Sequence, residues 1–330
     1  MNLKELPKIE LHCHLDGSVR VDTIIDLMKK ENMDLDGLDY EKIKKRLMVS
    51  EDCTSLVEYL ERFELPLKLM QTKESLERIT YELMEDAAKE NIKYIEIRFA
   101  PILHIEKGLS LKEIIESVIK GLKRGEEDFD IKGGIILSIL RHMDKKYAMP
   151  VIEAGKEFIG KGVVAIDLAG AENEGFVDDF VDDFKVGRDY GYNVTIHAGE
   201  TGFSINVIES IEKLKATRIG HGIAILKDEK AYDLVKNENV ILEMCPKSNV
   251  QTKAINTYEE HPIKRLLEDD IKASLCTDNR TVSNLILTDE YINGEEKLDL
   301  NEELFKKIYE SAVTGAFCSE ADKKWLMEQI

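Results

Sequence analysis

The sequence predicts a (β/α)8 barrel of the TIM type, a ring of parallel strands that alternate with helices. Short runs rich in Ile, Val and Leu alternate with longer helical patterns along the 330 residues. This alternation is typical of parallel strands covered by helices, and eight such runs match the strand number of a closed barrel. The predicted strands span residues 9–13, 92–99, 133–140, 163–169, 192–198, 216–221, 240–245 and 271–277.

An open, doubly wound sheet is the alternative that the same alternation allows. That fold would need a glycine-rich phosphate-binding turn after its first strand. The first predicted strand is followed instead by LDGS at residues 15–18, which is not such a turn. The closed barrel is therefore the preferred prediction.

The segments between the strands carry helical signatures. In residues 75–91 apolar side chains recur at helical spacing. They are Leu76, Ile79, Leu83 and Ala87. Ser110 and Glu113 have the spacing of a capping box, which predicts that a helix begins directly after Ser110.

A helical insertion interrupts this rhythm between the first and second strands. Residues 32–72 add no strand, and apolar side chains recur there at helical spacing, at Leu56, Leu60, Phe63 and Leu67. The segment is either a helix packed on the barrel or a lid over the active face, because long insertions after strands are often functional. No linker divides the chain, so residues 1–330 are predicted to form one barrel domain.

The composition narrows the class of partner. The formal net charge is 46 − 65 = −19, and such an acidic surface repels phosphate, so neither nucleic acid nor an anionic membrane is an expected partner. The N-terminal MNLKELPKIEL lacks a long apolar signal segment, and no stretch approaches the length of a membrane span. Five scattered cysteines without a C-x-x-C pair are typical of reduced thiols. A cytoplasmic protein is expected.

Two histidines close the first predicted strand, in IELHCHLDG at residues 9–17. Side chains two apart on a strand share one face and lie roughly 7 Å apart along the backbone. His12 and His14 can therefore converge on one point in the barrel mouth, as metal ligands do. Packing or hydrogen bonding of one ring inside the barrel is the other interpretation of this pair.

More polar residues follow later strands, at the carboxyl ends where barrels of this type carry their chemistry. His197 and Glu200 occur in TIHAGE, His221 in RIGHG, and Asp278 and Asn279 in CTDN. Three imidazoles and a carboxylate from distant strands suit Zn²⁺ with a water completing the shell. A metal lowers the pKa of such a water and supplies a hydroxide nucleophile, which indicates hydrolysis.

One zinc ion per chain is predicted. The end of the fourth predicted strand, VVAIDLAGAE, has no lysine nearby that could bridge a second metal. A purely structural zinc site would draw its ligands from local pairs of Cys or His. Here the candidates come from three distant strands, so a catalytic site is preferred.

The motifs PKIELHCHLDGS, VVAIDLAGAE, TIHAGE, RIGHG, CPKSNVQT and the TD of CTDN together resemble the adenosine deaminase family of metal-dependent amidohydrolases. They extend from residue 7 to residue 279 in the order of that family. The P-C-x-x-C element of the other zinc deaminases is absent. The resemblance implies a (β/α)8 barrel that hydrolyses the 6-amino group of adenosine, and of 2′-deoxyadenosine, giving inosine-type products and ammonia in purine salvage.

The resemblance also implies the role of each matching residue. The residues that match the zinc ligands are His12, His14, His197 and Asp278. His221 matches the residue that orients the attacking hydroxide and helps to take its proton, and Glu200 matches the residue that protonates purine N1. The substrate contacts implied are His14, Asp16 at the ribose 5′-hydroxyl, the backbone N–H of Gly170 at N3, and Asn279 at N7.

The chemistry of a purine supports two of these roles independently. Attack at C6 moves electrons onto N1, and a desolvated Glu200 can supply the proton that N1 then needs. A glycine at position 170 lets a ligand approach the backbone closely. An ordinary tight turn after the fourth strand would also explain Gly170, and a solvated loop carboxylate would also explain Glu200.

Asn279 departs from the family, which often has Asp-Asp after the last strand. N7 is an acceptor, so a carboxylate must be protonated to donate to it, whereas the Asn279 amide donates at any pH. Purine recognition is therefore expected to survive, with altered purines somewhat more acceptable. Adenine deaminase and deaminases of modified or phosphorylated adenosines share most of these residues, and a silent purine-binding relative is a further alternative.

The other polar residues are assigned to structure. Cys245, Lys247 and Ser248 follow the seventh strand at a turn fixed by proline, and Glu96 and Arg98 share one face of the second strand as a predicted buried pair. The three remaining histidines carry no predicted function. His142 and His261 are predicted to lie in loops or on the surface, and His104 is left unassigned.

Overall fold

The computed structural model of the chain describes residues 2–34, 37–50, 53 and 56–330, apart from the side chains of residues 56 and 57. The predicted contribution of the Leu56 side chain therefore lies outside the described residues.

Eight parallel strands form one sheet in the order β1 to β8, so each strand pairs with the next along the chain. The strands are β1 Lys8–His14, β2 Ile92–Phe99, β3 Lys132–Leu140, β4 Val163–Ala169, β5 Asn193–Ala198, β6 Arg218–His221, β7 Ile241–Met244 and β8 Ala273–Leu275. All eight predicted strands are confirmed. A doubly wound sheet would reverse its strand order part-way, and this sheet does not.

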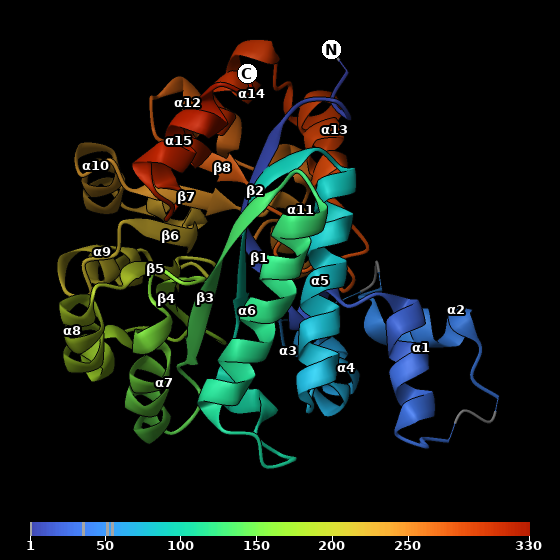
Figure 1. Cartoon of the computed structure of the whole chain (residues 1–330). Coiled ribbons are helices and arrows are strands. Elements are labelled where there is room, and N and C mark those ends of the chain that lie inside the picture. The colour runs from blue at the N-terminus through green and yellow to red at the C-terminus, as the bar shows by residue number, and fades with distance from the viewer. Residues whose placement is uncertain (1, 35–36, 51–52, 54–55) are drawn as a thin grey trace.

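Helices alternate with the strands along the chain. They are α1 Val21–Lys30, α2 Tyr40–Leu47, α3 Leu56–Leu60, α4 Glu64–Leu69, α5 Lys73–Lys89, α6 Leu111–Asp128, α7 Ala148–Gly155, α8 Val181–Tyr190, α9 Ser204–Glu212, α10 Glu229–Asn237, α11 Pro246–Gln251, α12 Ile263–Glu268, α13 Leu287–Leu298, α14 Glu302–Gly315 and α15 Glu320–Met327. Helices α5 and α6 lie side by side over β2 and β3, and both chain ends lie at one end of the barrel (Figure 1).

The helical patterns predicted from the sequence are present. Leu76, Ile79, Leu83 and Ala87 are all buried on the inner face of α5. The insertion between β1 and β2 contains helices and no strand within its described residues. Helices α1 and α2 stand to one side of the barrel (Figure 1). Within the described part of the chain no helix combines the length and the apolar character that crossing a membrane requires.

The seam between β8 and β1 closes the barrel with few backbone bonds. His14 N donates to Asp278 O at 2.7 Å, and Asp278 N donates to His12 O at 2.9 Å. Next to these bonds, the side chain of Glu10 joins the two strands in place of a backbone bond. Its carboxylate accepts from Thr277 N at 3.0 Å and from His12 N at 3.1 Å. Burial raises the pKa of Glu10 to about 7, against these hydrogen bonds.

Helix α6 begins with the predicted capping box. Ser110 Oγ accepts from Glu113 N at 3.3 Å, and Glu113 Oε2 accepts from Ser110 N at 3.0 Å. We expect Ser110→Ala to lower the free energy of unfolding by about 1 kcal/mol, because it removes the acceptor for an otherwise unpaired helical N–H. Urea unfolding measures this, and Ser110→Asp, which keeps an acceptor, is the control. Equal midpoints for Ser110→Ala and the unsubstituted chain would contradict the prediction.

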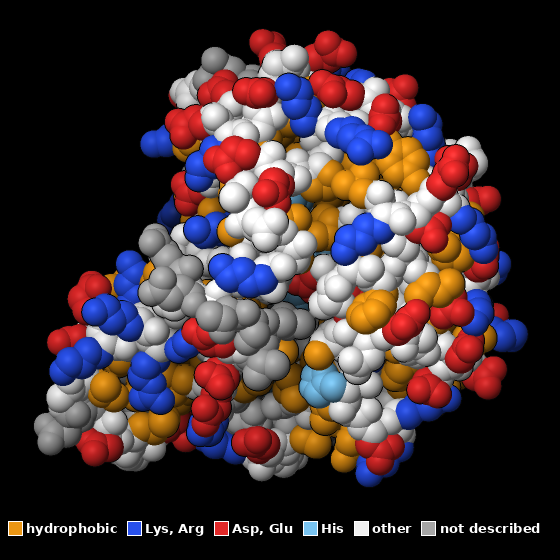
Figure 2. Space-filling view, turned by 180° about the vertical axis from the view of Figure 1, so that it is seen from behind, with side chains coloured by type: hydrophobic (Ala, Val, Ile, Leu, Met, Phe, Trp, Pro, Cys, Tyr) orange, Lys and Arg blue, Asp and Glu red, His pale blue; other side chains and the backbone are white. Residues whose placement is uncertain are grey.

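Charged side chains of both signs are interspersed over the face shown in Figure 2. Many of the described ion pairs on the surface join side chains three or four residues apart, such as Lys185 with Asp189 at 2.9 Å, and others join different elements, such as Lys73 with Glu113 at 2.7 Å. Pairs of this kind contribute little to stability. Negative and positive side chains are thus mixed on this face, although the chain as a whole has a net charge of −19.

Candidate metal and catalytic site

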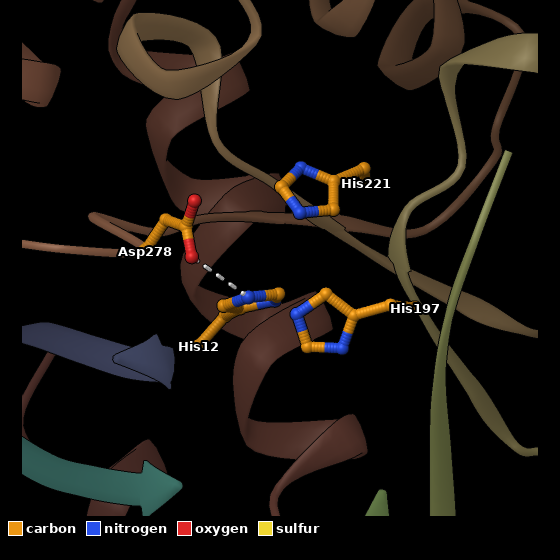
Figure 3. A group of neighbouring side chains, drawn as sticks. All are labelled: His12, His197, His221 and Asp278. Atoms are coloured by element: carbon orange, nitrogen blue, oxygen red, sulfur yellow. Dashed lines mark ion pairs between the residues drawn. The ribbon is translucent and has the colours of Figure 1, made fainter. Parts of the chain in front are cut away.

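The histidines predicted at strand ends meet inside the barrel mouth. His12 and His14 end β1, His197 lies on β5, and His221 ends β6. Asp278 follows β8 across the seam. Figure 3 shows His12, His197, His221 and Asp278 pointing toward one another, and their ligand atoms all lie within 4.8 Å of each other.

His14, at the end of β1, reaches the same point as His12. Its Nε2 lies 3.2 Å from Nε2 of His197 and 3.3 Å from Oδ1 of Asp278. Nε2 of His12 also lies 3.3 Å from Oδ1 of Asp278. Two atoms that share a tetrahedral zinc at its usual bond lengths stand about 3.4 Å apart, so these spacings fit one ion.

The protonation states also fit a cation. Nε2 of His12 is buried and has no hydrogen-bond partner among the described residues, as expected for an atom reserved for a ligand. Burial raises the pKa of Asp278, but the imidazoles of His12 and His14 outweigh this and hold it well below its ordinary value. The pKa of His14 is lowered, first by burial, so its ring is neutral. A neutral imidazole and a carboxylate are the forms that bind metal.

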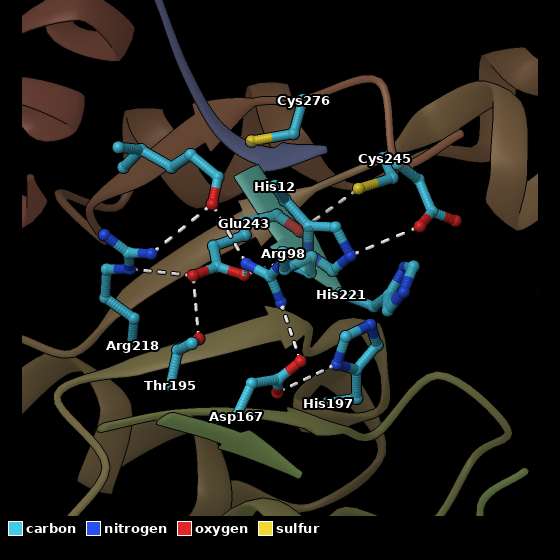
Figure 4. Close-up of polar contacts among 12 residues, drawn as sticks. His12, Arg98, Asp167, Thr195, His197, Arg218, His221, Glu243, Cys245 and Cys276 are labelled. Atoms are coloured by element: carbon cyan, nitrogen blue, oxygen red, sulfur yellow. Dashed lines mark hydrogen bonds and ion pairs between the residues drawn. The ribbon is translucent and has the colours of Figure 1, made fainter. Parts of the chain in front are cut away.

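Buried carboxylates hold two of the histidines from behind (Figure 4). Nδ1 of His12 lies 2.9 Å from Glu243 Oε2, and Nδ1 of His197 lies 3.0 Å from Asp167 Oδ1. A carboxylate accepts, so each Nδ1 carries the proton and each Nε2 keeps its lone pair for the site. Sequence reasoning missed Glu243 and Asp167, although both lie on strands with inward-facing polar residues.

Two buried arginines neutralise these carboxylates. Arg98 NH2 donates to Glu243 at 2.7 Å, and its NH1 lies 3.3 Å from Asp167. Arg218 donates to Glu243 at 2.7 Å and pairs with Glu96 at 2.6 Å. The prediction that Glu96 and Arg98 pair with each other is therefore wrong, although both side chains are buried as predicted. Each residue faces across the barrel interior to another strand instead of along its own.

The backbone is strained at two residues of the site. His221 and Asp278 have φ values of 63° and 61°, in the left-handed region that residues other than glycine rarely adopt. Such conformations cost roughly 1–3 kcal/mol each and gather at functional sites. They turn both side chains inward at points where the strands have ended.

Glu200 and the predicted substrate contacts line one cavity of ≈ 250 Å³ together with the histidines. The lining includes His14, Asp16, Gly170, Glu200, His221, Asp278 and Asn279. Oε2 of Glu200 lies 3.7 Å from Nε2 of His221. Tyr59, Leu60, Phe63 and Leu67 of the insertion line the same cavity, as the lid interpretation expects.

Comparison with known proteins decides the family. The family model described as adenosine deaminase matches residues 7–330 of the chain. The chain belongs to the adenosine deaminase family. An adenosine deaminase of Clostridium perfringens strain SM101 is 58% identical over 330 residues, which are 100% of this chain and 99% of that protein.

Solved structures of two other deaminases share the fold of this chain. The crystal structure of adenine deaminase from Arthrobacter aurescens has a TM-score of 0.90 and 24% identity, covering 98% of both chains. That of the Arabidopsis N6-mAMP deaminase has a TM-score of 0.86 and 28% identity, covering 99% of this chain and 98% of the other. These neighbours share the barrel.

Two glycines of the family motifs are required by close contacts. A Cβ on Gly17, in the motif LDGS, would lie 1.9 Å from Oδ1 of Asn279. Gly170 has a φ of 94°, and a Cβ there would lie 2.5 Å from Nδ1 of His142. The turn after β4 thus needs a glycine for its backbone conformation, and its neighbour is a histidine that sequence reasoning placed in a loop or on the surface.

His261 and His104 are buried, whereas His142 is exposed in the turn after β3, as predicted. His142 lines the cavity. His261 lies in a loop but is buried, and burial lowers its pKa to about 3; its assignment to a loop was correct, but a surface position would be wrong. His104 is buried, its Nδ1 lies 2.9 Å from Met70 O, and burial lowers its pKa to about 4. Both rings are neutral packing elements.

Proposed function

We propose that this protein is a zinc-dependent enzyme that hydrolyses adenosine, and 2′-deoxyadenosine, to the inosine product and ammonia. The observation that carries the proposal is the convergence of the histidines and Asp278 with Glu200 in one cavity. Membership of the adenosine deaminase family supports the reaction type. A purely binding relative would not need a proton donor beside the cation site.

One zinc ion fits the donor set, and His12, His14, His197 and Asp278 would hold it. When bound, zinc supplies a water of lowered pKa, and thereby a nucleophile near neutral pH. Imidazole and carboxylate ligands without thiolates suit zinc.

The protein residues then divide the proton transfers. Glu200 gives a proton to N1 as the attack on C6 moves electrons there. The Asp278 carboxylate, held ionised by its imidazole neighbours, accepts a hydrogen bond from the attacking water. His221, between Glu200 and Asp278, orients that water. The leaving amino group departs as ammonia after it has gained a proton.

Asp16 supports a nucleoside with a free 5′-hydroxyl. Its Oδ1 is buried without a partner among the described residues, so it can accept from a ligand hydroxyl. Burial raises the pKa of Asp16 to about 6, and when ionised it would repel a 5′-phosphate. Gly170 lines the same cavity, where its backbone N–H would meet N3.

The Asn279 side chain is proposed to donate to N7. Asn279 lines the cavity beside Asp278, and its amide nitrogen can donate at any pH. We expect Asn279→Leu to raise KM or lower kcat for adenosine by at least tenfold, because an unpaired N7 costs about 1–3 kcal/mol. Steady-state kinetics measures this, and Asn279→Asp, which can donate when protonated, should retain activity. Kinetics for Asn279→Leu that match the unsubstituted enzyme would refute the N7 contact.

The experiment that tests the function is ammonia release by the zinc-loaded protein from adenosine, adenine and adenosine monophosphate in parallel. Fast release from adenosine alone would support both the reaction and the role of Asp16. Release mainly from adenine or the monophosphate would keep the chemistry and overturn the ribose contact. No release from any of the three, with zinc bound, would overturn the proposed function in favour of a modified purine or a silent binder.

We also propose a cytoplasmic location, with a small purine as the partner. Cys13, Cys245, Cys276 and Cys318 carry free thiols, which is typical of a reducing compartment. A purine nucleoside fits the cavity chemistry of carboxylates, imidazoles and an amide.

A further inference from the structure

The short helix α11 brings two consecutive side chains to the site. It follows β7 and begins at Pro246, and its first N–H, on Lys247, donates to the buried carboxyl of Glu290 at 2.9 Å. Ser248 Oγ donates to Asp278 Oδ2 at 2.6 Å. Nδ2 of Asn249 lies 3.1 Å from Nδ1 of His221. The segment CPKSN, assigned to structure in the sequence, therefore contacts two groups of the reaction.

Asn249 has a fixed position. Its side chain is fully buried, its N–H donates to Cys245 O at 3.0 Å, and its carbonyl accepts from Ile255 N at 3.1 Å. The amide nitrogen faces the His221 ring, while Oδ1 has no partner within the described residues. An amide N–H can only donate, so Nδ1 of His221 is the acceptor in this contact.

We propose that Asn249 is a positioning residue that holds the neutral His221 ring in the tautomer with its proton on Nε2. In a neutral imidazole one nitrogen donates and the other accepts. The catalytic role of His221 rests on the proposed function, whereas the tautomer of its ring does not.

The tautomer decides which histidines can bind the cation. His12, His197 and His221 all belong to the mutually close group. The first two direct Nδ1–H at carboxylates and keep a lone pair on Nε2. A His221 ring with a proton on Nε2 has no lone pair there, so it remains outside the ligand set although it lies close.

The tautomer also changes the role implied by the family resemblance. A neutral ring with Nε2–H donates a hydrogen bond to the attacking water and does not take its proton. The proton released by that water then passes to the Asp278 carboxylate, the remaining acceptor of the group. Ser248 donates to Oδ2 of Asp278 and so helps to fix the position of that carboxylate.

The test reads the ring nitrogens directly. The zinc-loaded protein is labelled with ¹⁵N in its seven histidines, and the His221 signals are assigned by their loss in His221→Gln. We expect Nδ1 of His221 to show the shift of an unprotonated nitrogen and Nε2 that of an N–H. In Asn249→Asp, which has the same size but only accepts, the two shifts should exchange. For this variant kcat for adenosine should fall about 10²- to 10⁴-fold, with KM and zinc content little changed.

Asn256→Asp is the matched control. Asn256 is an exposed amide in the loop after α11 that pairs with Glu260 at 3.0 Å, so the His221 signals should not move. A protonated Nδ1 in the unsubstituted protein would overturn the proposal, as would unchanged His221 shifts in Asn249→Asp. The unsubstituted spectrum decides even if Asn249→Asp fails to fold. A protein with the expected tautomer but no activity on adenosine would disprove the proposed function and leave the positioning role intact.

Discussion

Glu200→Gln is expected to lower kcat for adenosine by about 10²- to 10⁴-fold, the range that a positioned general acid contributes. Glutamine keeps the size of the side chain and its ability to hydrogen-bond, but it has no carboxyl proton to give to N1. Because Glu200 is not one of the close metal-binding group, zinc should remain bound. KM should change by less than about threefold, since the shape of the cavity is kept. Initial rates of ammonia release and zinc content measure these quantities.

Glu174→Gln is the control for this variant. Glu174 is exposed in the loop after β4, so the same change of charge there should leave kcat unaltered. A Glu200→Gln enzyme with near-normal turnover would remove Glu200 from the proton transfer. Loss of zinc in this variant would instead show that the carboxylate supports the cation.

Glu243→Gln is expected to damage both stability and metal binding. Glu243 accepts from Arg98, Arg218 and Thr195 in a fully buried position and also faces Nδ1 of His12. Removing one partner of a buried ion pair costs about 3–5 kcal/mol, because the remaining charge stays buried. Replacing the group that orients a metal-binding histidine lowers metal affinity about 10- to 100-fold. Urea unfolding and competition with a chelator measure the two effects.

Asp189→Asn provides the comparison. This carboxylate forms an exposed pair with Lys185 one turn away on α8, and its loss should change the free energy of unfolding by less than about 0.5 kcal/mol. If Glu243→Gln were as stable as Asp189→Asn, the buried network would not be a source of stability.

The sequence predicts the barrel well because its strands are short apolar runs with little competing helical pattern. The predicted β2 and β4 agree with the structure at both ends. The last strand differs most from its prediction, since β8 spans only Ala273–Leu275 where residues 271–277 were predicted. Thr277 leaves the ladder to bond with the Glu10 side chain, a contact between opposite ends of the chain that no local pattern reveals.

The candidate site is only partly visible in the sequence. Histidines at strand ends are conspicuous, but the left-handed backbone of His221 and Asp278 depends on the surrounding structure. The partner of Arg98 could not be read from β2, because it lies across the barrel interior on Glu243. Similarly, Pro246 indicates a turn, and a turn alone does not reveal that the Ser248 and Asn249 side chains contact Asp278 and His221.

The position of the proposed cation at the seam between β8 and β1 would give it a role in stabilising the barrel. Its two backbone bonds are made by His12, His14 and Asp278, the residues proposed to hold zinc. The ion would therefore link the first strand to the last. Removing it would weaken the contact between β8 and β1 before the contacts between other strands. Amide hydrogens of His14 and Asp278 should then exchange with solvent faster in the zinc-free protein, while those in the middle of β3 remain protected. In this protein the catalytic ion would also stabilise the closure of the barrel.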